Sequence, residues 1–127
     1  MRDVRGREAE AVIAKLAQAV SSYESPTRYS AWPGPNSNTF VAHLGREIPE
    51  LRLAMPSTAV GKDYLPGGRI FARTPSGTGW QVSLLGLLGI AVGIDEGIEI
   101  NLLGMVFGVD VRRPALKLPG IGRLPDW

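Results

Sequence analysis

Ser37 is the residue whose setting best fits an enzymatic nucleophile. It lies in the segment WPGPNSNTFVAHLGREIPE, residues 32–50, after a Pro-Gly-Pro turn and at the start of a predicted helix. The N-terminus of a helix presents unpaired N–H groups and the positive end of the helix dipole. Such groups can activate a nucleophile or stabilise a developing oxyanion. The chemistry that this segment could support is therefore nucleophilic attack by Ser37 with stabilisation of an oxyanion.

A structural role for the same polar residues is the competing interpretation. Ser37 or Asn38 can cap the helix while Asn36 fastens the turn, because these side chains hydrogen-bond readily to nearby backbone groups. His43 lies on the same predicted helix, about 9 Å along its axis and about 120° around it from Ser37. A hydrogen bond between the two is thus excluded. A partner for Ser37 would have to come from elsewhere, such as Lys62, Asp63 or a second chain.

The composition of the chain excludes several classes of protein and of binding site. The chain has 127 residues, which suits a single domain, and 44% of them are hydrophobic, which excludes a disordered chain. Lys and Arg (14) exceed Asp and Glu (12) by a net charge of only +2, too little by itself to predict nucleic acid or an anionic membrane. One His and no Cys cannot build the usual zinc site. We expect neither a metal nor a cofactor.

Two helices are predicted in the N-terminal half. Apolar residues at helical spacing predict the first over residues 7–22 and the second over about 39–47, where Pro49 closes it. A short strand is predicted at residues 28–32. Residues 51–79 are predicted to be mostly loop, with another short strand at 69–73.

Residues 80–111 carry the strongest structural pattern. Apolar side chains alternate along residues 80–94, and Asp95-Glu96-Gly97 matches a three-residue turn that ends in glycine. Folding the chain there pairs apolar residues on one face, Ile94 with Ile98, Val92 with Ile100 and Ile90 with Leu102. The pattern predicts a long hairpin whose apolar face covers the second helix, and the later phase shift predicts a bulge near residues 103–104.

The carboxylates of this region are predicted to have structural roles. Asp95, Glu96 and Glu99 are predicted to be turn and exposed-face carboxylates.

A membrane-spanning helix is the competing interpretation of this region, since residues 74–94 carry no charge. However, only residues 82–94 are densely apolar, which is shorter than the ~20 residues a spanning helix needs. The glycines there would also cost about 1 kcal/mol each in a helix.

These elements define the predicted architecture. It is an α+β fold, with two helices packed on an antiparallel sheet dominated by a long apolar hairpin (80–111). Residues 1–127 form a single domain, and residues 112–127, which contain three prolines, form an extended, irregular tail. No signal peptide is predicted, because acidic residues interrupt the basic start and no apolar stretch follows. The cytoplasm is the default compartment, and an envelope association is left open.

Several strings resemble one family. WPGPNSNTFVAHLGREIPEL, PSTAVGKDYL, TPSGTGWQVSLLGLLGI and RRPALKLPGIGRL are similar to the bacterial family catalogued as domain of unknown function 3750. The similarity covers residues 29–124. It implies a bacterial protein with no established activity. Members of that family carry an upstream portion, so the resemblance implies that this chain is the C-terminal part of a longer architecture.

A looser resemblance suggests an activity. The string NSNTF resembles the Asn-Cys-x-Thr helix start of permuted papain-like proteins, so that Ser37 matches the nucleophilic cysteine and Asn36 the residue before it. This chain departs from the family in having Ser as the nucleophile and no His upstream of it. The resemblance implies a hydrolase- or acyltransferase-related domain that is degenerate or incomplete. It predicts a cleft at Ser37, covered by residues 60–68. The predicted binding residues are Asn36, Asn38, Thr39, Lys62, Asp63 and Tyr64.

A binding module without catalytic activity is the alternative function. The second face of the predicted hairpin is rich in Gly and Leu rather than charged. An apolar face exposed over several hundred Å² typically marks contact with a membrane or a protein partner. The basic residues of the tail lack interleaved aromatic residues, so no nucleic-acid partner is predicted.

Overall fold

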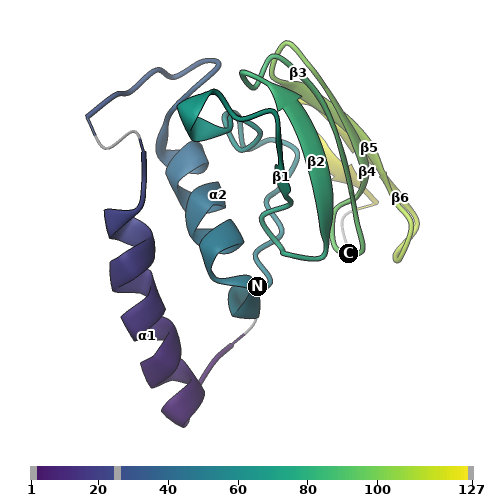
Figure 1. Ribbon diagram of the computed structural model, residues 1–127. Coiled ribbons are helices and arrows are strands. Elements are labelled where there is room, and N and C mark those ends of the chain that lie inside the picture. Colours follow the sequence, from purple (N-terminus) through teal and green to yellow (C-terminus); the bar gives the residue numbers. More distant parts are fainter. Residues whose placement is uncertain (1–2, 25–26, 126–127) are drawn as a thin grey trace.

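The computed structural model describes residues 3–24 and 27–125 and arranges them in three layers (Figure 1). The helix α1 (Gly6–Ser21) is outermost, the helix α2 (Ser37–Glu47) lies in the middle, and a seven-stranded antiparallel sheet forms the third layer. The predicted α+β class with two helices and an antiparallel sheet is confirmed. Of the two helices, α2 lies next to the sheet, whereas α1 packs against α2.

A small apolar core joins the two helices. Val12 and Ala19 of α1 are buried against Ile48, which follows α2. Partly buried Leu44 and Leu51, the latter from the 3-10 turn η1 (Pro49–Leu51), pack against this cluster. The first helix was predicted within one residue of its observed bounds, although only part of its apolar stripe meets α2: Val12 and Leu16 pack there, whereas Ile13 and Val20 are exposed.

The start of α2 is set by a different residue from the predicted one. Asn36 has extended backbone angles, and its side chain accepts hydrogen bonds from the backbone N–H groups of Asn38 and Thr39. The Thr39 hydroxyl accepts a bond in return from the N–H of Asn36, which completes a capping box. The prediction that Ser37 or Asn38 would be the cap is wrong, because Ser37 already belongs to the helix.

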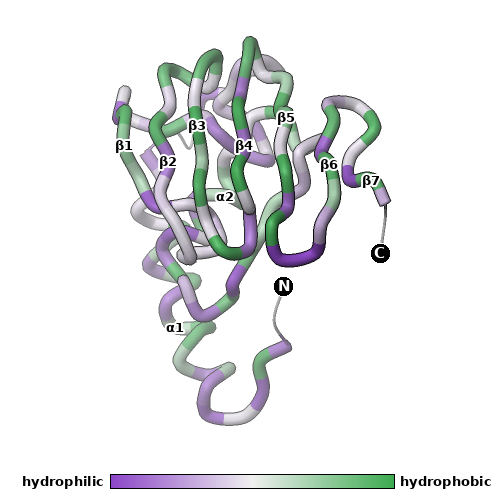
Figure 2. Tube along the Cα trace, turned by 90° about the vertical axis from the view of Figure 1, so that its right-hand side faces the viewer, coloured by the Kyte–Doolittle hydropathy of each residue, from purple (hydrophilic) through white to green (hydrophobic). Residues whose placement is uncertain are grey.

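Seven strands follow one another across the sheet in chain order (Figure 2). They are β1 (Phe71–Arg73), β2 (Gly79–Leu84), β3 (Leu88–Gly93), β4 (Gly97–Leu102), β5 (Met105–Asp110), β6 (Ala115–Leu118) and β7 (Gly122–Leu124). A second 3-10 turn, η2 (Pro66–Gly68), precedes β1. The strand predicted at residues 69–73 is confirmed as β1. The strand predicted at 28–32 is wrong, since the segment forms bends, and the N–H of Ser30 bonds to the Pro35 carbonyl rather than to a strand.

The segment predicted as one long hairpin, residues 80–111, forms four strands. Leu85 and Gly86, with φ of 52° and 70°, turn the chain after β2. Leu103 and Gly104, with φ of 54° and 86°, turn it again after β4. Two successive residues with positive φ are typical of the tight type I′ turn. The bulge predicted near residues 103–104 is therefore a turn.

The central turn falls where the sequence predicted it, with a shifted register. Gly97 has a φ of 73° and opens β4, as expected for the glycine that closes a three-residue loop. Val92 lies opposite Ile98 rather than the predicted Ile100, and Ile90 lies opposite Ile100. A shift of two residues leaves the same side chains on the same face.

The two faces of the sheet are covered in the opposite way to the prediction. We call the side facing away from the helices the outer face, and Figure 2 looks onto it with α2 behind the sheet. Its exposed residues are Phe71, Trp80, Val82, Leu84, Leu88, Ile90, Val92, Ile98, Ile100, Leu102, Met105, Phe107, Val109, Leu116 and Leu124. The inner face, toward α2, carries Gln81, Glu99 and Asn101, all buried. The apolar face predicted to cover the second helix thus points away from it, because polar groups of α2 and residues 60–65 bond to the inner face.

The segment predicted to be an irregular tail adds two strands. β6 pairs with β5 and β7 pairs with β6, which extends the sheet at its C-terminal edge. Pro114 and Pro119 flank β6 rather than interrupt it, so neither removes a hydrogen bond from within that strand. Residues 126 and 127 lie outside the described part of this segment.

Candidate functional site

Ser37 is exposed on the first turn of α2 and lines a hollow of about 420 Å³. The other residues lining it are Val20, Tyr23, Thr27, Arg28, Tyr29, Asn36 and Phe40. None of these described residues is a His, Asp, Glu or Lys, so the hollow supplies no ordinary general base. Burial and the neighbouring Tyr64 raise the pKa of Tyr23, so this phenol stays protonated at neutral pH.

The predicted binding residues on α2 hold a loop in place. The side-chain amides of Asn36 and Asn38 donate to the carbonyl of Val60, at 3.0 and 2.9 Å. The Thr39 hydroxyl donates to the carbonyl of Gly61 at 2.7 Å. The loop predicted to cover a cleft at Ser37 therefore contacts the start of α2 through the backbone of residues 60 and 61, but none of its residues lines the hollow at Ser37.

His43 faces the other helix. Its Nε2 lies 2.8 Å from the carbonyl of Ala19 and 3.1 Å from the Ser22 hydroxyl. Since a carbonyl only accepts hydrogen bonds, Nε2 carries the proton in this contact. The expectation that His43 cannot serve Ser37 agrees with this position, in which the imidazole ties the end of α1 to α2.

The remaining predicted binding residues lie away from the hollow at Ser37. Lys62 and Asp63 are buried between α2 and the inner face, with exposed fractions of 2% and 8%. Tyr64 is also buried and packs against Gly34 and Gly86, where an added Cβ would come within 3.0 and 3.2 Å of it. None of the three lines the hollow.

A charged network occupies the inner face. The Lys62 Nζ lies 2.6 Å from one carboxylate oxygen of Glu99 and 3.2 Å from Asp63. The Lys117 Nζ lies 2.7 Å from the other oxygen of Glu99. Arg46 of α2 joins this layer by donating to the Gln81 side chain at 2.8 Å. A single buried carboxylate is thus shared by two ammonium groups.

Lys62 and Arg46 of this network stay charged at neutral pH. Burial alone would lower the pKa of Lys62, but the carboxylates of Asp63 and Glu99 outweigh it and raise the pKa. Burial lowers the pKa of Arg46 to about 10, although Asp63 opposes the shift. The inner face therefore holds compensated charges rather than a free base.

Two carboxylates that the sequence pattern predicted to be exposed are buried. Glu96 and Glu99, predicted to be exposed, are both 2% exposed. Glu96 accepts hydrogen bonds from the Ser76 N–H and hydroxyl, at 3.1 and 2.8 Å, and from the Thr78 hydroxyl at 3.2 Å. The seryl and threonyl groups of residues 74–79 thus replace solvent around this carboxylate.

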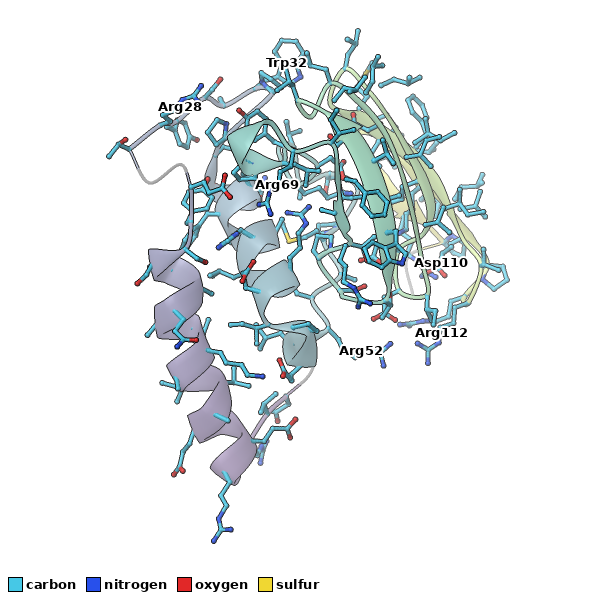
Figure 3. The ribbon with its side chains drawn as sticks, in the orientation of Figure 1. Arg28, Trp32, Arg52, Arg69, Asp110 and Arg112 are labelled. Atoms are coloured by element: carbon cyan, nitrogen blue, oxygen red, sulfur yellow. The ribbon has the colours of Figure 1, made fainter. Side chains whose placement is uncertain are left out.

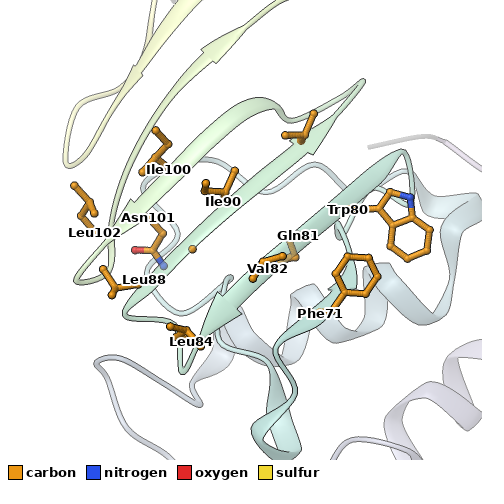
Figure 4. Close-up of a pocket in the computed structure, with 12 residues that line it drawn as sticks. Phe71, Trp80, Gln81, Val82, Leu84, Leu88, Ile90, Ile100, Asn101 and Leu102 are labelled. Atoms are coloured by element: carbon orange, nitrogen blue, oxygen red, sulfur yellow. The ribbon is translucent and has the colours of Figure 1, made fainter.

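The outer face contains an apolar hollow of about 650 Å³ (Figure 4). It lies over β1 to β4. At one side the rings of Phe71 and Trp80 stack with centroids 5.0 Å apart, and the Arg73 guanidinium lies 4.8 Å from the Trp80 ring. Ile90, Ile100 and neighbouring aliphatic side chains form most of the rest, and Gln81 and Asn101 also line the hollow. This shape fits an apolar ligand or surface.

The described residues contain neither a candidate metal site nor a candidate membrane-spanning helix. Within residues 3–24 and 27–125, no three His, Cys, Asp or Glu side chains are grouped closely enough to hold a metal ion. Neither α1 nor α2, nor either short 3-10 turn in the described ranges, has the length and hydropathy to cross a membrane.

The fold and the exposed sheet define an α+β protein with an uncovered apolar face. The family described as protein of unknown function (DUF3750) matches residues 1–64, which include both helices and the segment 60–64 beneath the sheet. The chain belongs to this family. The predicted resemblance is confirmed over this range, and the quoted strings beyond residue 64 lie outside the match. The comparisons with curated proteins and with solved structures found no match, so the papain-like resemblance is not shown.

Proposed function

We propose that this protein is a binding module whose outer face docks on a lipid surface. The observation that carries the proposal is that an apolar face spanning all seven strands is uncovered. Its side chains range in exposed fraction from 39% at Phe107 to 58% at Phe71. Apolar surface of this kind gains free energy when it is removed from water.

The size of the outer face supports an interaction site. The six-residue strands β2 to β5 extend about 20 Å, and seven strands span about 29 Å, which gives a footprint of at most about 600 Å², since β1, β6 and β7 have only three or four residues. The largest apolar patch on a typical soluble monomer is about 300–600 Å² and is often functional. The outer face therefore lies at the upper end of what an isolated soluble domain normally leaves exposed.

The distribution of charge favours lipid over a protein partner. Arg52 and Arg112 lie at one end of the sheet, and Trp32 lies at the opposite end, near the exposed Leu85 and Leu103 (Figure 3). Arginine attracts the phosphates of lipid headgroups, whereas leucine and tryptophan enter the apolar boundary. Protein interfaces typically form about ten hydrogen bonds. The outer face offers almost no side-chain donor or acceptor for them, and acyl chains need none.

Flotation with vesicles tests the proposal. The wild-type protein should float with vesicles of mixed phosphatidylcholine and phosphatidylglycerol, and Ile90→Glu should abolish flotation. Ile90 is 55% exposed, so the variant should remain folded. Ile13→Glu is the matched control, because Ile13 is 65% exposed on α1 and its loss should leave flotation unchanged.

The oligomeric state, measured by light scattering, gives the opposing outcome. A stable dimer that Ile90→Glu dissociates, together with no flotation of the wild type, would mean that a second copy covers the outer face. That result contradicts lipid docking. Equal loss of flotation in both glutamate variants would contradict it as well, because binding would then follow net charge rather than the outer face.

Acyl transfer at Ser37 is the second candidate function. It is favoured by the exposed position of Ser37 on the first turn of α2 and by the hollow of about 420 Å³ beside it. It requires a base from a second chain or from outside the described residues. Labelling with a fluorophosphonate probe at Ser37, abolished by Ser37→Ala, would support it. Absence of labelling would contradict it.

A further inference from the structure

We propose that a cleft at the arginine end of the sheet binds a phosphate group, as inorganic phosphate or a phosphate monoester. The cleft, which we call the arginine cleft, lies between residues 52–58 and the strands β5 to β7. Two adjoining hollows of about 640 and 650 Å³ form it. They share Ala54, Asp95, Asp110 and Arg113.

Ion pairs fix three guanidinium groups around the cleft. Asp95 pairs with Arg52 at 2.9 Å and with Arg112 at 3.3 Å. Asp110 pairs with Arg123 at 3.0 Å. Figure 3 shows Arg52, Asp110 and Arg112 gathered at this end of the sheet. The carboxylates use only part of the donor capacity of these arginines, because each guanidinium carries five N–H groups.

Arg113 supplies a cation that no described residue neutralises. Its guanidinium makes no hydrogen bond or ion pair with the described residues, although its backbone N–H donates to Asp110 and its carbonyl accepts from Arg123. Lys117 also lines the cleft, but its ammonium is bonded to Glu99 in the interior. Arg113 is therefore free to bind an anion.

Ser57 provides an independent indication of a ligand. It lines the cleft, is only 5% exposed, and its hydroxyl is buried without a hydrogen-bond partner among the described residues. A buried hydroxyl normally finds a partner, because leaving it unpaired costs free energy. An oxygen of a bound anion in the cleft would accept its hydrogen.

The charge of the cleft matches that of a phosphate. Four arginines face two aspartates, which leaves an excess of two positive charges. Burial would raise the pKa of Asp110, but hydrogen bonds from the N–H groups of Arg113 and Arg112 and from the Arg123 guanidinium outweigh it and lower the pKa. Asp110 is thus ionised at neutral pH. A phosphate monoester carries about −1.5 to −2 at that pH, and arginine binds phosphate oxygens in pairs.

Titration with inorganic phosphate, followed by NMR at low ionic strength, tests this site without any membrane. Its outcome is therefore separate from that of the lipid proposal. The wild type should bind, and Arg113→Gln should weaken binding by about tenfold or more, as expected for one charge-assisted contact. Ser57→Ala should weaken binding several-fold, and it should raise the melting temperature without phosphate because it removes an unpaired hydroxyl. Arg7→Gln, with the same charge change on exposed α1, should leave affinity within about twofold.

Three results would overturn the proposal. They are no phosphate binding by the wild type, equal weakening by Arg7→Gln and Arg113→Gln, and unchanged affinity in Ser57→Ala. Vesicles of phosphatidylcholine containing phosphatidic acid identify the source of the phosphate, using Ile90→Glu to remove docking by the outer face. Recruitment that depends on Arg113 assigns a lipid headgroup, whereas phosphate binding without recruitment assigns a soluble phosphate.

Discussion

The inner and outer faces of one sheet show two opposite solutions to burial. The inner face buries Glu99 between Lys62 and Lys117, while the outer face leaves Ile98 and Ile100, the neighbours of Glu99 in β4, about half exposed. Burying charges is favourable only when they are paired and hydrogen-bonded, and here they are. The comparison teaches that alternation along a strand separates two faces but does not determine which of them the rest of the chain covers.

The largest expected effect compares neighbouring residues on the two faces. Glu99→Gln keeps the shape of the side chain but leaves two buried ammonium groups short of a counter-charge. We expect it to lower the free energy of unfolding by about 3–5 kcal/mol. Ile100→Ala should cost about 1 kcal/mol or less, because that side chain is already 45% exposed. Urea unfolding of both variants measures the difference.

A reversal of this order would break the comparison. If Ile100→Ala cost as much as Glu99→Gln, the outer face would be packed against another surface in solution. The network on the inner face would then contribute little to stability.

The second effect concerns the polar segment that opens α2. Asn36→Ala removes the N-cap and the bond to Val60, so we expect a loss of about 2 kcal/mol. Ser37→Ala should change stability by less than about 0.5 kcal/mol, since Ser37 is exposed. Thermal melts of the two variants measure this contrast. Equal destabilisation would mean that Ser37, and not Asn36 alone, secures the start of the helix.

Local signals in the sequence predicted the elements well. Helical spacing located α1, Asp95-Glu96-Gly97 located the turn between β3 and β4, and alternation placed Glu99 on the opposite face from Ile98 and Ile100, whereas the turns at residues 85–86 and 103–104 were not predicted. The misassigned elements depend on contacts between distant residues. Glu99 became buried because Lys62 and Lys117 reach it from 37 and 18 residues away.

The candidate site was less predictable than the fold. Asn36 was expected to fasten a turn, and its side-chain amide does so by donating to the carbonyl of Ala31 at 3.0 Å, but its second role as the N-cap of α2 was not predicted. Residues 62–64 were expected beside Ser37, but the lysine among them forms its ion pair on the inner face of the sheet. Neither the orientation of the outer face nor the arginine cleft has a local signal, since both arise when strands far apart in the chain align.

The smallest expected effect concerns a pH-dependent ion pair at the rim of the sheet. Hydrogen bonds from Arg112, Arg113 and Arg123 outweigh burial and lower the pKa of Asp110. Its stabilisation is therefore present above the pKa of an aspartate in the unfolded chain, about 3.9, and is lost as the pH falls through the lower value of the folded state. Asp110→Asn retains an acceptor oxygen but cannot titrate in this way. We expect a loss below about 1 kcal/mol at neutral pH and a shallower fall in stability below about pH 4.

Urea unfolding at several acidic pH values measures this fall. Glu10→Gln is the control, since it removes an exposed carboxylate on α1 and should leave the slope unchanged. Parallel decreases for the wild type and Asp110→Asn would contradict the assignment. In that case the acid sensitivity would arise elsewhere in the molecule.

The fluorescence of Trp80 tests most directly whether the outer face is the docking surface. Trp80 is 51% exposed at the centre of the stacked Phe71 and Arg73 side chains. In a variant with Trp32 and Trp127 replaced by Phe, we predict that vesicles with brominated acyl chains quench this emission and that aqueous acrylamide quenches it less once vesicles are present. Unchanged access to acrylamide, with no quenching by brominated lipid, would contradict the account.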